Sequence, residues 1–203
     1  MNIETVKTIE ELDEVLEFFE VIYAASPVEI QENGLYSRKW WIDEFGKNPE
    51  LLIYARDEGK ICGAIIGWGD KGGNVTVGGD GVLKEYKDKG VHEALFIEIE
   101  KRAKKLGFPG IGFGIFEGQE EFCAKLGYTG KMLIQSEKHS VEDLKNYLES
   151  LSNKNYELTG TNIHDGYINQ LWLNISVLEK DLRKKFEEEL GDCWCQIIVS
   201  KAI

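Results

Sequence analysis

The stretch YKDKGVHEALF (residues 86–96) decides how this chain is read, because it joins the end of a strand to a helix through a short charged turn. Apolar residues recur at helical spacing after Gly90, which predicts a helix from there to about residue 106. The first N–H groups of a helix lack intrahelical partners and lie at the positive end of its dipole, where phosphate binds. Lys87 and Lys89 add positive charge, so the sequence predicts a phosphate-binding turn.

The strand before this turn, VTVGGDGVL (residues 75–83), is unusually rich in glycine. Glycine inside a strand marks a bulge or the close approach of a ligand or another backbone, and the alternative is a poorly packed edge strand. An open backbone edge would accept the amides of an extended ligand. Coenzyme A has a pyrophosphate at one end and amides along its arm, so it suits both the turn and the strand.

Strand and helix patterns alternate over the first two thirds of the chain. The runs LLIYAR (residues 51–56) and ICGAIIGWG (residues 61–69) flank the turn DEGK and predict an antiparallel hairpin. After the helix that follows Gly90 come a buried strand, GIGFGIF (residues 110–116), and a short helix within GQEEFCAKL (residues 118–126). This alternation predicts an α/β (α+β) fold built in layers.

The last third has a different style, with a helix, a hairpin around HDG, another helix and a terminal strand. If residues 131–137 are counted as a strand, the order is β-α-β-β-α-β, which is typical of the ferredoxin-like fold. Asp165 and Gly166 are expected to take positive φ in the hairpin turn, and Ser176 with Glu179 predicts a capping box for the last helix. We therefore predict two closely packed domains, residues 1–137 and 138–203.

Composition argues against several classes of partner. The 203 residues carry 36 acidic and 24 basic side chains, and this net charge of -12 repels nucleic acid and anionic lipid. The N-terminus lacks the pattern of a signal peptide, and no apolar run approaches the ~20 residues of a membrane helix. We therefore expect a cytoplasmic protein. Cys193 and Cys195 are interpreted as small buried hydrophobes, and no metal site is expected.

Residues 87–92 resemble the pyrophosphate turn of the GNAT superfamily of acyl-CoA-dependent N-acyltransferases, [RQ]-x-x-G-x-[GA], and FCAKLGY (residues 122–128) resembles the helix and glycine stop after that family's fifth strand. The resemblance covers roughly residues 1–137. It implies a mixed, mostly antiparallel central sheet flanked by helices, with the smaller α+β tail outside it. It also implies acetyl-CoA as the acyl donor. The contacts to coenzyme A that it implies come from Val82, Leu83, Lys87, Asp88, Lys89, Gly90, Val91, His92 and Phe122.

Three residues depart from the family pattern. His92 replaces a small residue: either its ring donates to a phosphate, or only its backbone N–H matters and the ring points to solvent. We expect the second, because a helix start binds phosphate with any side chain. Cys123 stands where the family usually has a tyrosine that protonates the thiolate, and Phe116 replaces an asparagine. Cys123 is thus either a weaker proton donor or a small buried apolar residue.

The resemblance implies that a neutral amine attacks the acyl thioester directly. Backbone N–H groups along Gly81–Leu83 would stabilise the oxyanion, and Asp80 or Glu117 would take the proton of the amine. The alternatives are that Asp80 is a bulge residue facing solvent and that Glu117 only complements a helix dipole. Trp40 or Trp41 is expected to line the amine pocket, and at least one of them to lie in the core.

We therefore expect an N-acetyltransferase that acts on a primary amine of a small molecule or peptide. The departures at His92, Phe116 and Cys123 also suit a different class of protein, a catalytically silent acyl-CoA-binding or interaction module. The tail (residues 138–203) either caps the acceptor pocket or mediates a homodimer, and the sequence leaves both open.

Overall fold

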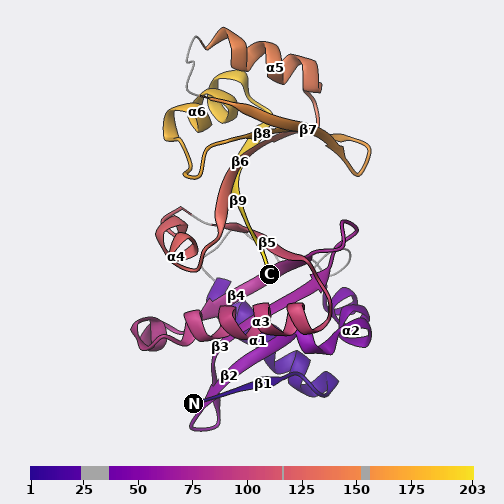
Figure 1. Cartoon of the computed structure of the whole chain (residues 1–203), viewed down its shortest axis with the longest axis vertical. Helices are drawn as coiled ribbons and strands as arrows, with labels where there is room; N and C mark the ends of the chain where they lie inside the picture. Colours follow the sequence, from indigo (N-terminus) through magenta and orange to yellow (C-terminus); the bar gives the residue numbers. More distant parts are fainter. Residues whose placement is uncertain (24–36, 116, 152–155) are drawn as a thin grey trace. The chain divides into compact units, whose positions relative to one another are not determined.

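The computed structural model describes residues 1–23, 37–115, 117–151 and 156–203. Contacts divide the chain into two compact units, Met1–Gly112 with Ala202–Ile203 and Phe113–Lys201. The elements of both are labelled in Figure 1. This division by contacts falls before residue 137, where the resemblance to a known family ends. The assignment of residues 1–137 and 138–203 as two domains stays a prediction.

The first unit contains a mixed, mostly antiparallel sheet in the order β1-β2-β3-β4-β5, in which only the pairing of β4 with β5 is parallel. This confirms the fold class that the sequence predicts. Its elements are β1 (Asn2–Thr5), α1 (Ile9–Tyr23), α2 (Arg38–Lys47), η1 (Pro49–Leu51), β2 (Leu52–Asp57), β3 (Lys60–Gly69), β4 (Val75–Val82), η2 (Lys84–Lys89), α3 (Val91–Lys105) and β5 (Gly110–Ile115), whose last residues belong to the second unit.

The glycine-rich strand is β4, and it is an interior strand with a bulge. It pairs with β3 along its length and with β5 at Val75 and Thr76. Gly79 and Gly81 pack against α1, so the interpretation as a poorly packed edge is wrong. The register with β3 shifts between Ile66 and Gly67, which makes Gly78 the bulge residue. The ladder recorded between β4 and β5 covers Val75↔Ile111 and Thr76↔Gly112. Residues 77–82 lie beyond this ladder, and we call their side facing away from β3 the β5-side edge.

Helices cover both faces of this sheet, and α3 lies across its strands in Figure 1. Gly63 of β3 faces Val91 and Leu95 of α3, whereas Gly81 of β4 faces Ile22 of α1. Gly81 pairs with Ala64, the residue next to Gly63, and successive side chains of a strand point to opposite faces. α1 and α3 therefore pack on opposite faces of the sheet. The apolar core beneath α1 and α2 consists of Val6, Leu12, Val15, Phe18, Phe19, Trp41, Leu52, Tyr54, Ala64 and Ile66.

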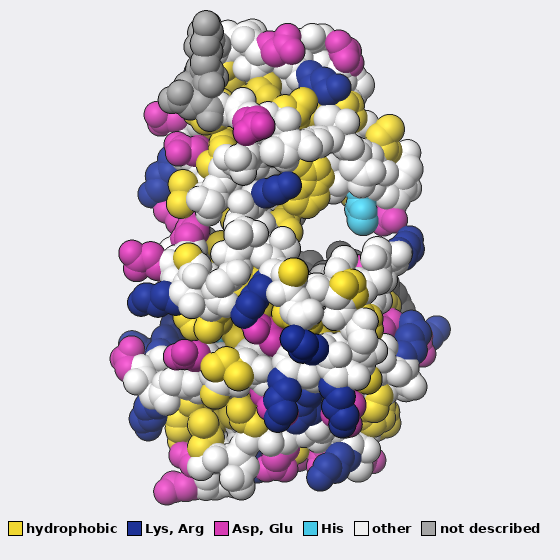
Figure 2. Space-filling model, in the orientation of Figure 1, with side chains coloured by type: hydrophobic (Ala, Val, Ile, Leu, Met, Phe, Trp, Pro, Cys, Tyr) yellow, Lys and Arg dark blue, Asp and Glu magenta, His cyan; other side chains and the backbone are white. Residues whose placement is uncertain are grey.

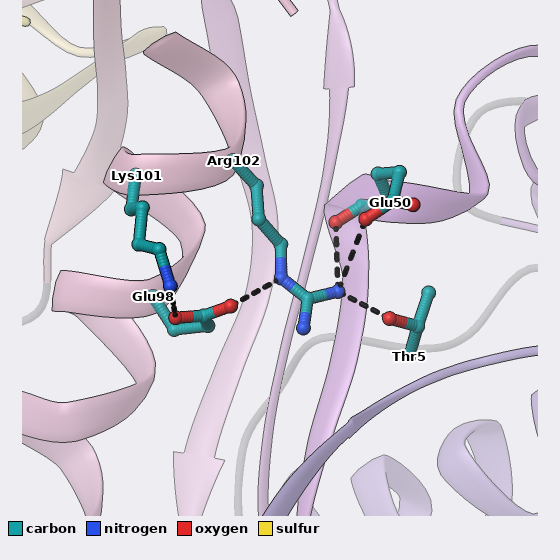
Figure 3. A network of polar contacts seen from close by, with 5 residues as sticks. All are labelled: Thr5, Glu50, Glu98, Lys101 and Arg102. Atoms are coloured by element: carbon teal, nitrogen blue, oxygen red, sulfur yellow. Dashed lines mark hydrogen bonds and ion pairs between the residues drawn. The ribbon is translucent and has the colours of Figure 1, made fainter. Parts of the chain in front are cut away.

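Arg102 fixes the C-terminal half of α3 to two other segments of the unit. Its guanidinium donates to Glu98 on the same helix, with Nε 2.8 Å from Oε1, and to the hydroxyl of Thr5 and to Glu50 (Figure 3). The guanidinium is 13% exposed, so solvent screens these interactions less than those of a surface pair. Hydrogen bonding to Arg102 also lowers the pKa of Glu98. The helix that carries the predicted phosphate turn is therefore held firmly on the sheet.

The second unit has the strand order β9-β6-β8-β7 with antiparallel pairing throughout. β8 lies between β6 and β7, which is the split βαβ arrangement of the ferredoxin-like fold and confirms that prediction. The elements are α4 (Glu120–Lys125), β6 (Thr129–Ser136), α5 (Val141–Ser150), β7 (Leu158–His164), β8 (Ile168–Leu173), α6 (Lys180–Lys184), η3 (Lys185–Leu190) and β9 (Cys193–Ala202).

Two local predictions in the second unit have opposite outcomes. Asp165 and Gly166 take φ of 49° and 83°, as the hairpin turn requires. The capping box predicted for Ser176 and Glu179 is wrong, because α6 begins only at Lys180 and its N-cap, Glu179, makes no side-chain capping bond. The last helix therefore exists as predicted, but it begins later than the capping pattern indicates.

The surface charge, the helices and the cysteines of the described residues bear on the partners that composition excludes. Figure 2 shows acidic and basic side chains interspersed on the face in view. Among the described residues, no helix is long and apolar enough to cross a membrane, and no group of three or more His, Cys, Asp or Glu side chains could hold a metal ion. Burial raises the pKa of Cys193 to about 11 and raises that of Cys195 further. Both thiols therefore resist ionisation, as expected for packed side chains.

Candidate functional site

The backbone of Asp80 in β4 is held by a side chain from α1. The hydroxyl of Tyr23 donates to the carbonyl oxygen of Asp80 at 2.8 Å and accepts from its N–H at 3.2 Å. Backbone groups of successive strand residues point to opposite sides, and those of Asp80 point away from β3. The last residue of α1 therefore occupies the β5-side edge of β4.

Two glycines allow α1 to come this close. A Cβ on Gly81 would lie 2.8 Å from Cγ2 of Ile22, and a Cβ on Gly79 would lie 3.3 Å from the ring of Phe19. Phe19 in turn stacks on Tyr23, with ring centroids 5.7 Å apart and planes at 10°. The glycine-rich strand is therefore explained by the close approach of the helix that positions Tyr23.

From the other face of the sheet, His92 reaches the carboxylate of the same residue. Its Nε2 lies 2.6 Å from Oδ2 of Asp80, and the two side chains are 23% and 17% exposed. The ring also meets Phe96 edge-to-face at 5.2 Å. The expectation that His92 points to solvent is therefore wrong. Asp80 is not a bulge residue facing solvent either, since the bulge lies at Gly78.

The phenol of Tyr23 is a persistent hydrogen-bond donor. Burial raises its pKa well above the ordinary tyrosine value, and the negative charge of Asp80 raises it further, while the hydrogen bond to the Asp80 backbone offsets part of this shift. The phenol therefore keeps its proton across the physiological pH range.

The turn before α3 has the backbone geometry that the sequence predicts. Gly90 has φ of 72°, in the left-handed region, and its carbonyl accepts the first helical bond, from Ala94 at 3.0 Å. The N–H groups of Val91, His92 and Glu93 precede that bond and lie at the positive end of the helix dipole. A helix start with this geometry is suited to binding an anion.

The charged side chains of this turn are exposed, and one aromatic residue anchors it. Lys87, Asp88 and Lys89 are exposed, and Nζ of Lys89 lies 4.2 Å from the ring centre of Tyr86. The hydroxyl of Tyr86 donates to Oδ2 of Asp57 at 3.0 Å, which ties the turn to the β2–β3 hairpin. Two lysines are therefore presented to solvent beside the start of α3.

The predicted oxyanion donors need correction. The N–H of Leu83 donates to the carbonyl of Cys62 in β3 at 3.0 Å, so it is not directed to a ligand. By strand alternation the N–H of Gly81 also points toward β3. The prediction of donors along Gly81–Leu83 is therefore wrong for those two residues. The N–H groups that face the β5-side edge belong to Asp80 and Val82.

The other predicted catalytic residues lie in the second unit. Glu117 pairs with Lys180 at 2.7 Å, both side chains are largely exposed, and the hydrogen bond to Lys180 lowers the pKa of Glu117. A lowered pKa makes this carboxylate a weaker base. Cys123 in α4 is buried, at 2% exposed, and Phe122 beside it is half-buried. The structure thus brings Asp80 and His92 together, while Phe116 lies outside the described residues.

The tryptophans of α2 form an aromatic cluster with Trp68 of β3. Ring centroids of Trp40 lie 4.7 Å from Trp41 and 4.9 Å from Trp68, in edge-to-face contact. Trp41 is 3% exposed and belongs to the core, as expected of at least one tryptophan, whereas Trp40 is partly buried. Trp41 is thus enclosed by the core, which leaves Trp40 as the tryptophan of α2 with exposed surface.

Sequence reasoning missed Tyr23 as a site residue. In the sequence it is one more apolar position on the first helix, and its partner lies 57 residues further along the chain. The signal that could have found it is indirect, because glycines at alternate positions of β4 imply that another element lies against that face.

Comparison with known protein families matches residues 12–128 to the Acetyltransferase (GNAT) family. The chain is similar to a GNAT family acetyltransferase of Staphylococcus aureus Mu50, with TM-score 0.54, 15% identity, and coverage of 64% of this chain and 84% of that one. It is also similar to a GNAT family acetyltransferase of Brucella melitensis solved with acetyl-CoA, with TM-score 0.49, 16% identity, and coverage of 63% and 82%. Comparison with curated proteins gives no match.

Proposed function

The chain belongs to the GNAT acetyltransferase family, and on that premise we propose that it moves an acetyl group from acetyl-CoA to a primary amine by direct attack in a ternary complex. The acceptor is a small molecule or a peptide. The hydrogen bond between Asp80 and His92 supports this proposal, because it joins a carboxylate on β4 to an imidazole in the first turn of α3.

Coenzyme A would be held by backbone groups more than by side chains. The start of α3 at Val91, His92 and Glu93 offers N–H groups to the pyrophosphate, and Lys87 and Lys89 add positive charge. The N–H of Val82 on the β5-side edge would bond to an amide of the pantetheine arm. The backbone N–H of His92 would thus bind the pyrophosphate, while its ring would take part in the proton transfer.

The proton of the amine would pass to the Asp80–His92 pair. The hydrogen bond between Nε2 and the carboxylate would let Asp80 stabilise an imidazolium that forms when His92 takes this proton. The pair therefore modifies the expectation that Asp80 acts alone. Glu117 is less suited, because solvent and Lys180 already satisfy its charge.

The acceptor site is proposed to include Trp40, whose ring is partly buried beside Trp41 and Trp68. An aromatic face next to a carboxylate attracts an ammonium group. Asp43, an exposed residue on the same helix, could supply that carboxylate. The tail remains a candidate for dimerisation or for closing the acceptor pocket.

Calorimetric titration with acetyl-CoA, and in parallel with coenzyme A, tests the binding half of the proposal. We expect 1:1 binding of both, followed by amine-dependent release of thiol when amines are added. Absence of binding at millimolar ligand would contradict the proposal. Binding without thiol release from any amine would instead favour the catalytically silent module, for which the burial of Cys123 is the supporting observation.

A further inference from the structure

Tyr23 engages both backbone polar groups of one residue, although a packing role would need only its ring. The ring is already fixed by stacking on Phe19, and the hydroxyl reaches past it to the N–H and C=O of Asp80. These are the groups that β4 presents on its β5-side edge, where the proposed function places the acyl-CoA arm. A phenol and a backbone amide thus lie side by side at that edge, with 3.2 Å between oxygen and nitrogen.

We propose that Tyr23 is a catalytic residue, the side-chain donor of an oxyanion hole whose second donor is the N–H of Asp80. This inference rests on the proposed function. In the structure the phenol donates to the carbonyl oxygen of Asp80 and accepts from its N–H, so both donors would turn from these partners to the acyl oxygen. An acyl oxygen that enters between them becomes the acceptor for both donors, which is the arrangement that stabilises a developing oxyanion.

The step balances without an additional reactant. The lone pair of the amine forms a C–N bond to the thioester carbon, and the π electrons of the carbonyl move to its oxygen, which Tyr23 and Asp80 stabilise. The Asp80–His92 pair takes the proton of the amine. Collapse of the tetrahedral intermediate re-forms the carbonyl, breaks the C–S bond and releases the coenzyme A thiolate. Tyr23 keeps its proton throughout.

The surroundings of Tyr23 suit a neutral donor. The phenol is partly buried and lies near the Asp80 carboxylate, and both conditions disfavour a negative charge at the phenol oxygen and raise its pKa. His92 faces the same carboxylate from α3, and Phe19 covers the ring from α1. A donor that stays protonated stabilises the oxyanion without entering the proton transfer. This role differs from the thiolate protonation expected of Cys123.

The first test is Tyr23→Phe, which keeps the stacked ring and removes only the hydroxyl. Loss of one oxyanion donor lowers kcat by about 10²-fold, and we expect a loss of that size with little change in acetyl-CoA affinity. Tyr54→Phe is the matched control, because Tyr54 is a buried phenol of the same core whose hydroxyl bonds to Glu4 and not to β4. It should retain kcat. An equal loss in both variants would overturn the inference.

The second readout is the infrared carbonyl stretch of bound, carbonyl-labelled acetyl-CoA. A hydrogen bond from Tyr23 lowers this frequency, so the wild-type complex should absorb at lower frequency than the Tyr23→Phe complex. A fluorotyrosine at position 23 is a stronger donor and should lower the frequency further, and it serves if the phenylalanine variant does not fold. Identical frequencies in all complexes would leave Tyr23 as a structural contact only.

These outcomes separate the two proposals. If the wild-type protein does not bind acetyl-CoA, the proposed function fails and the oxyanion role fails with it. If acetyl-CoA binds and thiol is released, but neither kcat nor the carbonyl frequency depends on Tyr23, only the present inference fails.

Discussion

Asp80 lies within a glycine-rich strand and Glu117 follows another, but the two carboxylates have different surroundings in the structure. Asp80 is 17% exposed, its backbone is bonded to Tyr23 and its side chain to His92. Glu117 is 53% exposed and pairs with Lys180, whose side chain is 79% exposed. A fixed, partly buried carboxylate can orient another group, whereas an exposed pair is screened by water. Residue type alone therefore does not distinguish a carboxylate in a candidate site from a carboxylate on the surface.

The largest effect that would sharpen this comparison is expected from His92→Phe. The ring and its contact with Phe96 are preserved, but the proton acceptor is lost, so kcat should fall by about 10²-fold or more. Steady-state kinetics with saturating acetyl-CoA measures kcat of the variant and of the wild type. His164→Phe, at an exposed hairpin, is the control; equal kcat in His92→Phe and wild type would remove the pair from the mechanism.

Gly81→Ala tests whether the packing of α1 positions the site. The added Cβ would meet Ile22 at 2.8 Å, so α1 must shift, and overpacking of this kind costs about 1–3 kcal/mol in the free energy of unfolding. Denaturant unfolding measures the loss, and kcat should fall because Tyr23 moves with the helix. Gly160→Ala in β7 is the matched strand variant, since nothing lies within 4 Å of its Cβ position. Equal stability of the two variants would refute the close approach.

Gly90→Val is expected to act through the backbone of the turn. The φ of 72° is strained for a β-branched residue by about 1–2 kcal/mol, although the added atoms meet nothing within 4 Å. Relaxation of the turn should raise the Kd for coenzyme A by roughly tenfold, which calorimetry measures. Gly107→Val places the same strain, at φ of 89°, at the other end of α3 and should leave the Kd unchanged. A Kd that is unaltered in Gly90→Val would exclude the turn from binding.

The smallest effect is expected from Glu117→Gln. The carboxylate is exposed and its partner Lys180 is exposed, so neither kcat nor the thermal midpoint at neutral pH should change measurably. The lowered pKa of Glu117 means that any stabilisation by this pair is present at neutral pH and is lost as the pH falls through that pKa. Thermal melts at neutral and acidic pH compare the variant with wild type. A large fall in kcat would reverse the ranking of the two carboxylates.

Much of the fold could be predicted from local pattern. The helix after Gly90, the hairpin at residues 51–69 and the β-α-β-β-α-β order of the tail each follow from periodicity and turn residues within one segment. The start of α6 could not, because Ser176 and Glu179 have the capping spacing without the helical backbone that capping requires. A short motif shows that residues have the groups and the spacing to cap a helix, but the surrounding packing determines whether the backbone there is helical.

The candidate site was predictable only in part. The proposed phosphate turn at residues 87–92 depends on backbone N–H groups of one helix start, so the position of that helix start could be predicted from the sequence alone. Asp80 was named as a candidate, but its partners Tyr23 and His92 come from helices on opposite faces of β4. No spacing in the sequence connects these three residues.

The sequence by itself therefore determined the hairpin at residues 51–69, the helix after Gly90, the order of elements in the tail and the helix start that suits a phosphate, since each depends on contacts between near neighbours in the chain. Only the tertiary structure decided that the glycines of β4 admit α1, that His92 turns inward to Asp80 and that Tyr23 occupies the edge of the strand. These contacts join residues that are far apart in the sequence and lie on two faces of one sheet, and they are determined by how the helices pack on it.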